Sequence, residues 1–471
     1  MLFNSIEFLF FLPIVFIIYW FFCAKSVSLQ NMVLLCASYV FYGWWDWRFL
    51  FLIIFSTCLD FLLGIKIHNS KLSKKKFYLI ISIVFNLLIL GFFKYFNFFI
   101  NSLNEGLYSL GFTIDTWSLN VILPVGISFY TFQTLSYSID VYNKKLNPTK
   151  DFISYSAFVS FFPQLVAGPI ERAKNLLPQF INKREFNSIN AINGLSLILY
   201  GLFKKLVIAD RLAIYVNSVF NDYSTYSSIS LIIAVVFFAF QIYCDFSGYS
   251  LIARGTAKLF GFELMVNFNR PYFAQSITDF WRRWHISLST WFRDYLYIPL
   301  GGSRLSTKRT YINLMIVFVV SGLWHGANWT FVFWGLIHGL LAIIYLLLSN
   351  NSKRKNYSWV RKYLNILIVF VLVNFAWIFF RSDSINHAFN YIYYVFQFEF
   401  SFNLVQICAE KGPLNLFISL FAILSLYLSY LLPRNLTFDK TIKSVTFNVL
   451  AIITILVLGV NGESEFIYFQ F

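Results

Sequence analysis

The chain has 471 residues, of which 58% are hydrophobic, 21% aromatic and only 12% charged. A soluble domain usually carries about a quarter charged residues, so this composition excludes a soluble enzyme, a disordered protein and a disulfide scaffold as first interpretations. Apolar runs recur from residue 5 to residue 461 with no soluble block between them. This pattern predicts a single integral-membrane domain over residues 1–471.

The charge is unevenly distributed, with 37 basic against 21 acidic residues and a formal net charge of +16. The basic residues lie in short loops between apolar runs, and the positive-inside rule explains this placement without a nucleic-acid partner. The five cysteines occur singly, without CxxC or Cys/His spacing. The sequence therefore indicates neither a metal site nor a disulfide framework.

Membrane spans are expected along most of the chain, because a bilayer core of about 30 Å needs roughly 20 apolar residues per helix. The first stretch, Met1 to Trp20, contains Glu7, no basic residue and no cleavage pattern, which favours an uncleaved helix over a signal peptide. About twelve spans are predicted, at 5–22, 29–45, 48–65, 77–95, 119–138, 192–209, 229–251, 310–327, 330–349, 363–380, 414–432 and 445–461.

Loop charges orient these spans. The loop at 66–76 contains KLSKKK, the loop at 101–118 has no Lys or Arg, and 143–150 is basic again. If every basic loop is cytoplasmic, the N- and C-termini both lie outside.

Two stretches do not fit simple spans. Residues 152–169 are apolar, lie between basic loops and are interrupted by prolines and a glycine, which favours a re-entrant hairpin over a crossing. Residues 265–309 are both aromatic and basic. We expect helices there that lie at the cytoplasmic surface.

The densest cluster of chemically active side chains is 276–304. Ser276 and Asp279 are typical of a helix start, and a helix from there would place Trp281, His285 and Leu288 on one face. An interfacial amphipathic helix explains this pattern and is favoured on periodicity alone. The alternative is a site for an anionic donor, with four arginines available for phosphate contacts: Arg282, Arg283, Arg293 and Arg304.

A second cluster, 321–339, places His325 in an apolar span next to Gly326. An ionisable residue inside a membrane segment indicates function by default, and imidazole is well suited to take a proton from a hydroxyl. His338 in the same cluster is interpreted as a histidine hydrogen-bonded between helices. Further polar groups in apolar settings fit helix packing one by one but together indicate a polar cavity: Gln133, Asp140, Glu171, Arg172, Asp245 and Ser247.

Five ordered motifs carry a resemblance to a known family: LPVGISFYTFQ, FFPQLVAGPIER, YCDFSGYSLIARG, DFWRRWHISLSTWFRDYLYIPLGG and SGLWHGANWTFVFWGLIHG. They resemble the signature stretches of the membrane-bound O-acyltransferases, in the branch that contains the membrane subunits for alginate and peptidoglycan O-acetylation. The resemblance extends over nearly the whole chain.

The resemblance implies a helical fold around a tunnel from a cytoplasmic donor site to the outer side of the membrane. It implies that His325 is the catalytic histidine, that His285 is the second family histidine, and that acetyl-CoA is the donor, with no permanently bound cofactor. Arg282, Arg283, Trp284, Arg293 and Arg304 are then expected to bind the donor. Polar support along the tunnel is expected from Gln133, Asp245, Ser321, Trp324 and Asn328.

The ending at 466–471, FIYFQF, resembles the FxYxxF ending of extracytoplasmic acyl-transfer systems, in which Tyr468 would carry the acyl group for a time. An aromatic membrane anchor is the alternative. The resemblance also implies an extracytoplasmic partner transferase of the SGNH serine-hydrolase type, a polysaccharide acceptor such as an alginate-like polymer or peptidoglycan, and the bacterial inner membrane as location.

Two further functions remain open from the sequence. A polytopic transporter or flippase for a lipid-linked sugar has the same composition and the same buried polar residues. Within the enzyme class, the acceptor is alternatively a lipid or a protein in the membrane. Release of free CoA from acetyl-CoA distinguishes an acyltransferase from a transporter.

Overall fold

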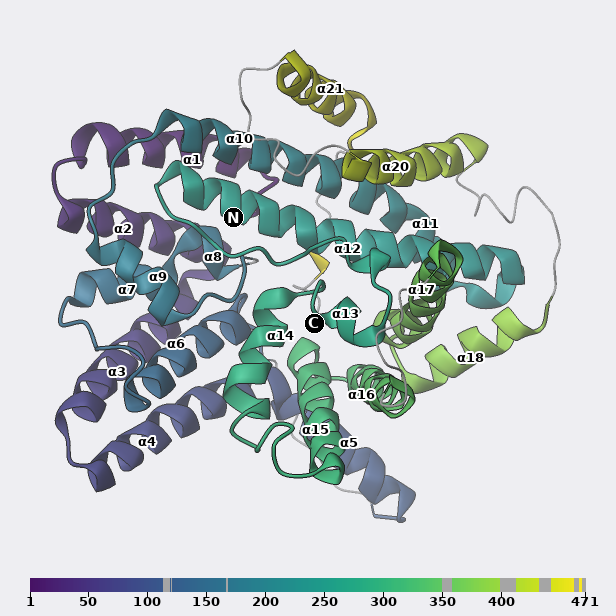
Figure 1. Ribbon diagram of the computed structural model, residues 1–471, viewed down its shortest axis with the longest axis horizontal. Helices are drawn as coiled ribbons and strands as arrows, with labels where there is room; N and C mark the ends of the chain where they lie inside the picture. The colour runs from purple at the N-terminus through teal and green to yellow at the C-terminus, as the bar shows by residue number, and fades with distance from the viewer. Residues whose placement is uncertain are drawn as a thin grey trace. The chain divides into compact units, whose positions relative to one another are not determined.

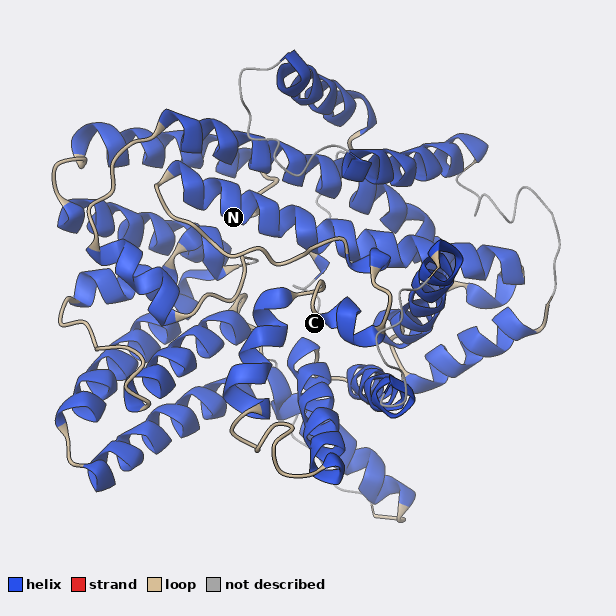
Figure 2. Cartoon of the chain, viewed as in Figure 1, coloured by secondary structure: helices blue, strands red, loops and turns tan. Residues whose placement is uncertain are grey.

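The structure of the chain, a computed structural model, describes residues 1–112, 119, 121–166, 168–349, 358–398, 412–431, 442–460 and 466–467. Within these ranges every regular element is a helix and no strand occurs (Figure 2). The prediction of an all-α membrane protein is confirmed. Figure 1 labels the helices in chain order.

Among the residues that the structure describes, six helical runs are long and apolar enough to cross a membrane, so the chain is a multi-pass membrane protein. They are Val27–Asn69, Leu72–Ser109, Ser188–Asn221, Ser228–Leu259, Trp329–Ser349 and Trp359–Arg381, and shorter apolar helices lie at Ile6–Phe22, Pro413–Leu428 and Asn448–Leu458. The chain divides into two compact units, residues 1–198 with 251–265 and residues 199–250 with 266–471.

The first unit is built from the N-terminal helices. They are α1 (Ile6–Ile17), η1 (Ile18–Phe22), α2 (Val27–Asp46), η2 (Trp47–Phe49), α3 (Leu50–Asn69), α4 (Leu72–Leu90), η3 (Gly91–Tyr95), α5 (Phe96–Ser109), α6 (Ile127–Tyr142), α7 (Phe152–Ser160), α8 (Phe162–Leu165), α9 (Ala173–Ile181), most of α10 (Ser188–Leu202) and the end of α12 (Ser228–Leu259). Buried polar bonds join its distant parts. Trp20 Nε1 donates to the Leu259 carbonyl at 2.8 Å, and Arg184 Nε donates to Tyr19 Oη at 2.6 Å.

The segment expected to form a hairpin, 152–169, consists of two short helices. The 9-residue α7 ends where Phe161 adopts φ −51° and ψ 103°, and the 4-residue α8 follows. At 1.5 Å per residue, α7 extends about 14 Å, which is less than half of a bilayer core. This stretch therefore does not cross a membrane as one helix.

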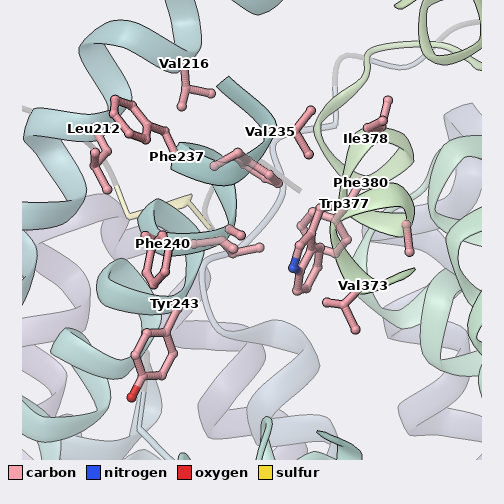
Figure 3. Packing of buried hydrophobic residues seen from close by; sticks show 14 of the residues in the cluster. Leu212, Val216, Val235, Phe237, Phe240, Tyr243, Val373, Trp377, Ile378 and Phe380 are labelled. Carbon is pink, nitrogen blue, oxygen red and sulfur yellow. The ribbon is translucent and has the colours of Figure 1, made fainter. Parts of the chain in front are cut away.

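The second unit holds the remaining elements. They are η4 (Phe203–Ala209), α11 (Asp210–Asn221), η5 (Tyr223–Thr225), most of α12, η6 (Pro271–Phe273), α13 (Ile277–Trp281), α14 (Ile286–Phe292), η7 (Arg293–Tyr297), α15 (Thr307–His325), α16 (Trp329–Ser349), α17 (Trp359–Arg381), α18 (Ile385–Phe396), α20 (Pro413–Leu431) and α21 (Ile442–Leu458). Side chains of α11, α12 and α17 meet in a buried aromatic and aliphatic cluster, which includes Val216, Phe240 and Trp377 (Figure 3). This cluster forms the core that supports the site.

Serine caps begin several of these helices. Ser276, Ser306 and Ser384 each accept a hydrogen bond from the backbone N–H three residues later, at 3.1, 3.2 and 3.1 Å. Such a cap satisfies one of the unpaired N–H groups at a helix start and contributes about 1 kcal/mol. The helix start predicted at Ser276 is confirmed.

Candidate active site

His325 lies at the end of α15, where α15 meets α16 at close range. Glycines permit this approach: a Cβ atom at Gly322 would lie 2.2 Å from the Phe331 carbonyl oxygen, and one at Gly335 would lie 2.4 Å from that of Phe318. Small residues allow membrane helices to pack backbone to backbone. Gly326, which follows His325, equally excludes a side chain, because its Cβ would lie 2.1 Å from the Phe331 ring. The backbone next to His325 is therefore fixed by packing.

Aromatic rings surround the His325 imidazole, which is 2% exposed. The ring centroids of Trp324, Trp334 and Phe380 lie 5.1, 5.0 and 5.5 Å from that of His325, all at steep interplanar angles. Such a wall excludes water and fixes the ring orientation. A buried base in surroundings of low dielectric interacts more strongly with a nearby charge than it would in water.

His285 adopts a strained backbone conformation, with φ 41° in the left-handed region. Asn267 stabilises it: the Asn267 carbonyl accepts from Ile286 N at 2.9 Å, and its side-chain oxygen accepts from Ser287 N at 3.1 Å. The same oxygen lies 3.2 Å from His285 Nδ1, so Nδ1 is the protonated nitrogen. A left-handed conformation at a non-glycine residue is uncommon and often marks a functional site.

The prediction of one helix from Ser276 through Leu288 is wrong. The first helix, α13, ends at Trp281, and α14 begins only at Ile286. Contacts with Asn267, which is distant in sequence from Trp281, override the local helical pattern. His285 therefore does not share a helical face with Trp281.

The two histidines nevertheless lie together. Their ring centroids are 6.3 Å apart, and the Trp324 ring contacts both of them. His285 is fully buried, and burial lowers its pKa to about 3. The structure thus places a neutral imidazole beside His325.

The four predicted donor-binding arginines differ in their surroundings. Arg283 Nε pairs with Asp279 at 2.9 Å, and Arg293 Nε pairs with Asp294 at 2.8 Å. Arg282 and Arg304 are exposed. Two of the four guanidinium groups are thus already paired within the described chain, while exposure leaves the other two accessible to an anion.

A cavity of about 310 Å³ lies among α13, α14, η7, α15 and α16. It is lined by Thr278, Trp281, Leu288, Ser289, Phe292, Arg293, Tyr297, Leu314, Val317, Phe318, Ser321, Ala342 and Leu346. The walls are mostly apolar. Its lining includes the exposed Arg293 and also Ser321, which is buried one helical turn before His325 on α15.

Trp284, a predicted donor-binding residue, and the predicted polar support residues occupy different kinds of position. Trp284 is fully buried, with its ring 5.1 Å from that of Trp377, so it belongs to the core. Asn328 caps α16 by accepting from Thr330 N at 3.0 Å, and it also donates to the Asp383 carbonyl at 2.9 Å. Gln133 lies in the first unit, where its Nε2 donates to the Phe158 carbonyl at 2.7 Å.

Asp245 belongs to a buried ion cluster that the sequence interpretation missed. Lys205 Nζ lies 2.7 Å from Asp245 Oδ1 and 2.9 Å from Asp210 Oδ1, and all three side chains are at most 4% exposed. The available signal was the FKKLVIAD run, which places Lys205 and Asp210 inside an apolar stretch. Charges in such a place are expected to be paired.

The predicted acyl carrier, Tyr468, lies outside the described residues. Its neighbours Phe466 and Ile467 are described, and both are buried at 0% and 6% exposed. The Phe466 ring lies 4.5 Å from the Tyr249 ring of α12 and nearly parallel to it. This stretch therefore packs into the second unit.

The second unit thus combines a buried histidine pair with a mostly apolar cavity, which Ser321 lines one turn before His325, and with exposed arginines on or beside the elements that line this cavity. Imidazole suits proton transfer from a hydroxyl, and a mostly apolar cavity suits a long substrate arm with few charges. These features define a class: a multi-pass membrane enzyme with a buried histidine site.

Comparisons with known proteins give the family. A family model described as MBOAT, the membrane-bound O-acyltransferase family, matches residues 148–386, which include both histidines. The chain is 41% identical over 419 residues to a probable alginate O-acetylase AlgI from Pseudomonas aeruginosa, covering 88% of this chain and 78% of that protein. It is 38% identical over 418 residues to a peptidoglycan O-acetyltransferase from Helicobacter pylori, covering 82% and 78%.

A more distant relative is a teichoic acid D-alanyltransferase from Bacillus subtilis, 26% identical over 285 residues, which are 57% of this chain and 71% of that protein. The chain belongs to the membrane-bound O-acyltransferase family. It is an O-acyltransferase, and the resemblance of its sequence motifs to this family is confirmed.

Proposed function

We propose that the protein takes an acetyl group from cytoplasmic acetyl-CoA and passes it across the membrane for O-acetylation of an extracytoplasmic polysaccharide. The observation that carries this proposal is the similarity over most of the chain to relatives named for O-acetylation of alginate and of peptidoglycan. The buried histidine pair and the adjacent cavity support it. The acceptor is an alginate-like polymer or peptidoglycan.

In the chemical step, His325 acts as the general base. Its imidazole removes the proton of an acceptor hydroxyl while the hydroxyl oxygen attacks the thioester carbonyl carbon. The carbon–sulfur bond breaks, an ester forms, and the CoA thiolate takes up a proton. Base catalysis of this kind contributes typically about 10²–10⁴-fold. The role of His285 is to orient the substrate, because its Nδ1–H is directed to Asn267 and this bond holds the ring in place.

Acetyl-CoA is expected to bind with its phosphates at the exposed arginines. Arg282 and Arg304 are exposed, whereas Arg283 and the likewise exposed Arg293 pair with carboxylates, so the first two are the main candidates. The mostly apolar cavity suits the pantetheine arm, which carries few charges. Ser321 lines this cavity one turn from His325 and supports delivery of the thioester to the base.

The first acceptor hydroxyl is that of Tyr468. A tyrosyl ester formed there carries the acetyl group to the outer side of the membrane, where an SGNH-type partner transferase moves it to a sugar hydroxyl. A covalent intermediate divides one difficult transfer into two easier ones. The protein acts in the bacterial inner membrane with both termini outside, as the alternation of loop charges indicates.

The test uses purified protein and acetyl-CoA labelled in the acetyl group. We expect release of CoA and label on the protein with the wild type, and loss of both with His325→Ala. His338→Ala is the matched control, because His338 is equally buried on α16 but packs against Phe280 and Trp281 rather than next to His285. Equal CoA release by the wild type and His325→Ala would contradict the role of His325 as general base, and no CoA release by the wild type would contradict acetyl-CoA as the donor.

A further inference from the structure

The segment that follows α21 is tied to α11 and η4 at two points. Arg211 Nη2 donates to the Leu458 carbonyl at 2.7 Å, where α21 ends. Two residues later, Val460 N donates to the Leu206 carbonyl at 3.1 Å. Leu206 lies in η4, a π-helix. Such helices are rare in proteins overall, but where they occur they are often part of a functional site. Both bonds hold the end of α21 and Val460 beside α11 and η4.

Phe466 and Ile467 contact α12 directly. Ile467 N donates to Asp245 Oδ2 at 2.8 Å within a buried environment, and the Phe466 ring stacks on Tyr249 at 4.5 Å and 28°. Asp245 and Tyr249 are four residues apart in the helix, so their side chains lie on one face. Asp245 accepts the hydrogen bond from the Ile467 backbone, and Tyr249 stacks on the Phe466 ring. A bond to a backbone N–H is typical of peptide recognition.

Asp245 is kept in place for this contact by Lys205. The lysine ammonium lies 2.7 Å from Asp245 Oδ1, which leaves Oδ2 directed toward Ile467. Gly248 allows α12 to pack closely against the end of α10, just before η4, because a Cβ at Gly248 would lie 2.8 Å from the Gly201 carbonyl oxygen. Two carboxylates share one ammonium, so the cluster retains a negative charge. A backbone N–H donor stabilises such a buried charge by a charge-assisted hydrogen bond.

The contact face is continuous with the histidine pair. The Phe246 ring lies 5.7 Å from the Phe466 ring and 4.6 Å from the His285 ring. A single aromatic side chain therefore separates the segment from His285, which is in turn 6.3 Å from His325.

We propose that Lys205, Asp245, Phe246 and Tyr249 form a binding site for the segment at 466–467, here called the C-terminal seat. Its ligand is an aromatic segment of this same chain, bound through a backbone N–H and a stacked phenylalanine. Asp245, Lys205 and Tyr249 act as positioning residues: they hold Phe466 and Ile467 next to Phe246, whose ring contacts that of His285, and so position this segment for acyl transfer. This role in acyl transfer rests on the proposed function, whereas the binding itself does not.

Photo-crosslinking of the full-length protein tests the seat without any acyl donor. A benzophenone-bearing phenylalanine analogue replaces Phe466, and mass spectrometry identifies the crosslinked peptide. We expect crosslinks to the α12 peptide that contains Phe246 and Tyr249. Ile467→Pro removes the N–H donor and lies outside the ion cluster, so we expect about tenfold less of this crosslink, in line with the loss of a charge-assisted bond. Ile467→Ala keeps the N–H and is the matched control.

A second pair of variants tests the Asp245 carboxylate, which accepts the hydrogen bond from Ile467 N. Asp245→Leu removes it and leaves a neutral Lys205–Asp210 pair, and Asp210→Leu leaves a neutral Lys205–Asp245 pair. We expect loss of the α12 crosslink in the first variant only. Crosslinks that form outside α12 in the otherwise unchanged protein, or equal crosslinking by Ile467→Pro and Ile467→Ala, would overturn the seat.

Acetyl-CoA consumption by the same preparations separates this inference from the proposed function. Crosslinking to α12 without any CoA release supports the seat while the proposed function fails. CoA release together with crosslinks elsewhere overturns the seat while the function stands. If both hold, acetylation at position 468 should fall in Ile467→Pro about as much as the crosslink does.

Discussion

The imidazole rings of His285 and His325 lie with their centroids 6.3 Å apart, although His285 precedes α14 and His325 ends α15, in a different sequence motif. His285 is turned toward this position by a left-handed backbone at φ 41°, and His325 is placed there by the end of α15. The pair therefore depends on two separate packing arrangements. A substitution that disturbs either packing arrangement should lower the catalytic rate even though both histidines are unchanged.

Gly326→Ala should disturb the position of His325. The added Cβ would lie 2.1 Å from the Phe331 ring, so the backbone or that buried ring must shift. Overpacking costs typically about 1–3 kcal/mol, and a displacement of about 1 Å at a catalytic group lowers activity by about 10²-fold. CoA release and thermal stability of the purified protein measure both effects.

Gly106→Ala is the control for this change, because no atom lies within 4 Å of the added Cβ and Gly106 is exposed on α5. Alanine there should be neutral or slightly stabilising, by about 0.5–1 kcal/mol. Full activity in Gly326→Ala would show that packing at this glycine does not position His325.

Neutralising the exposed arginines should weaken donor binding. In Arg282→Gln/Arg304→Gln we expect KM for acetyl-CoA to rise about tenfold, since each lost phosphate contact removes a charge-assisted hydrogen bond. Acetyl-pantetheine lacks the nucleotide phosphates, so its KM should stay the same. Steady-state kinetics with both donors make the comparison.

Arg361→Gln removes the same charge at the start of α17 and serves as the control. An equal rise in KM for both donors, or for the control variant, would contradict a phosphate-binding role of Arg282 and Arg304.

Filling the cavity should hinder the donor. Val317 lines the cavity from α15, and Val317→Phe reduces its volume of about 310 Å³. We expect kcat/KM for acetyl-CoA to fall about 10–10²-fold, because the thioester no longer reaches its productive position. Val320→Phe adds the same bulk on an exposed part of the same helix and should leave the rate unchanged. Equal rates in both variants would show that the donor does not use this cavity.

Stability should fall as the pH is lowered below the ordinary pKa of histidine. Burial lowers the pKa of His285 to about 3, whereas an unfolded histidine has a pKa near 6.5. Between these values the unfolded chain binds a proton that the folded chain does not. The contribution of His285 is therefore complete above about pH 6.5 and is lost as the pH falls toward about 3. The titratable ring that faces His285 is that of His325.

Thermal unfolding of the purified protein at about pH 7 and about pH 5 should show a smaller decrease in Tm for His285→Gln than for the wild type. His68→Gln, which changes an exposed histidine at the end of α3, should behave like the wild type. The same decrease in all three proteins would exclude His285 as the source.

Tyr468→Phe should abolish polysaccharide O-acetylation in cells. Phenylalanine keeps the aromatic ring that a membrane anchor needs, but it lacks the oxygen that would accept the acetyl group. Ester-linked acetate on cell-wall and secreted glycans is the measurement. Tyr393→Phe, on the exposed face of α18, is the control. Unchanged acetylation in Tyr468→Phe would favour the anchor over the carrier.

The sequence by itself determined the class of protein and most helices, and it singled out both histidines as candidates. The length of an apolar run can be read directly from the sequence. A serine cap joins residues three apart, so it is visible in the sequence as well, as at Ser276 and Ser306. The motif around His325 likewise contains the glycines that close α15 onto α16. The single-domain organisation and the membrane orientation stay predictions.

Only the tertiary structure decided how these parts meet. The helix predicted through His285 is broken by Asn267, two of the four arginines pair with carboxylates, and Lys205 joins Asp210 to Asp245. Each of these outcomes depends on a partner distant in sequence. Periodicity reports the local conformational preference of the backbone, but a buried hydrogen bond or ion pair stabilises a competing local structure, and its partner is known only once the chain has folded.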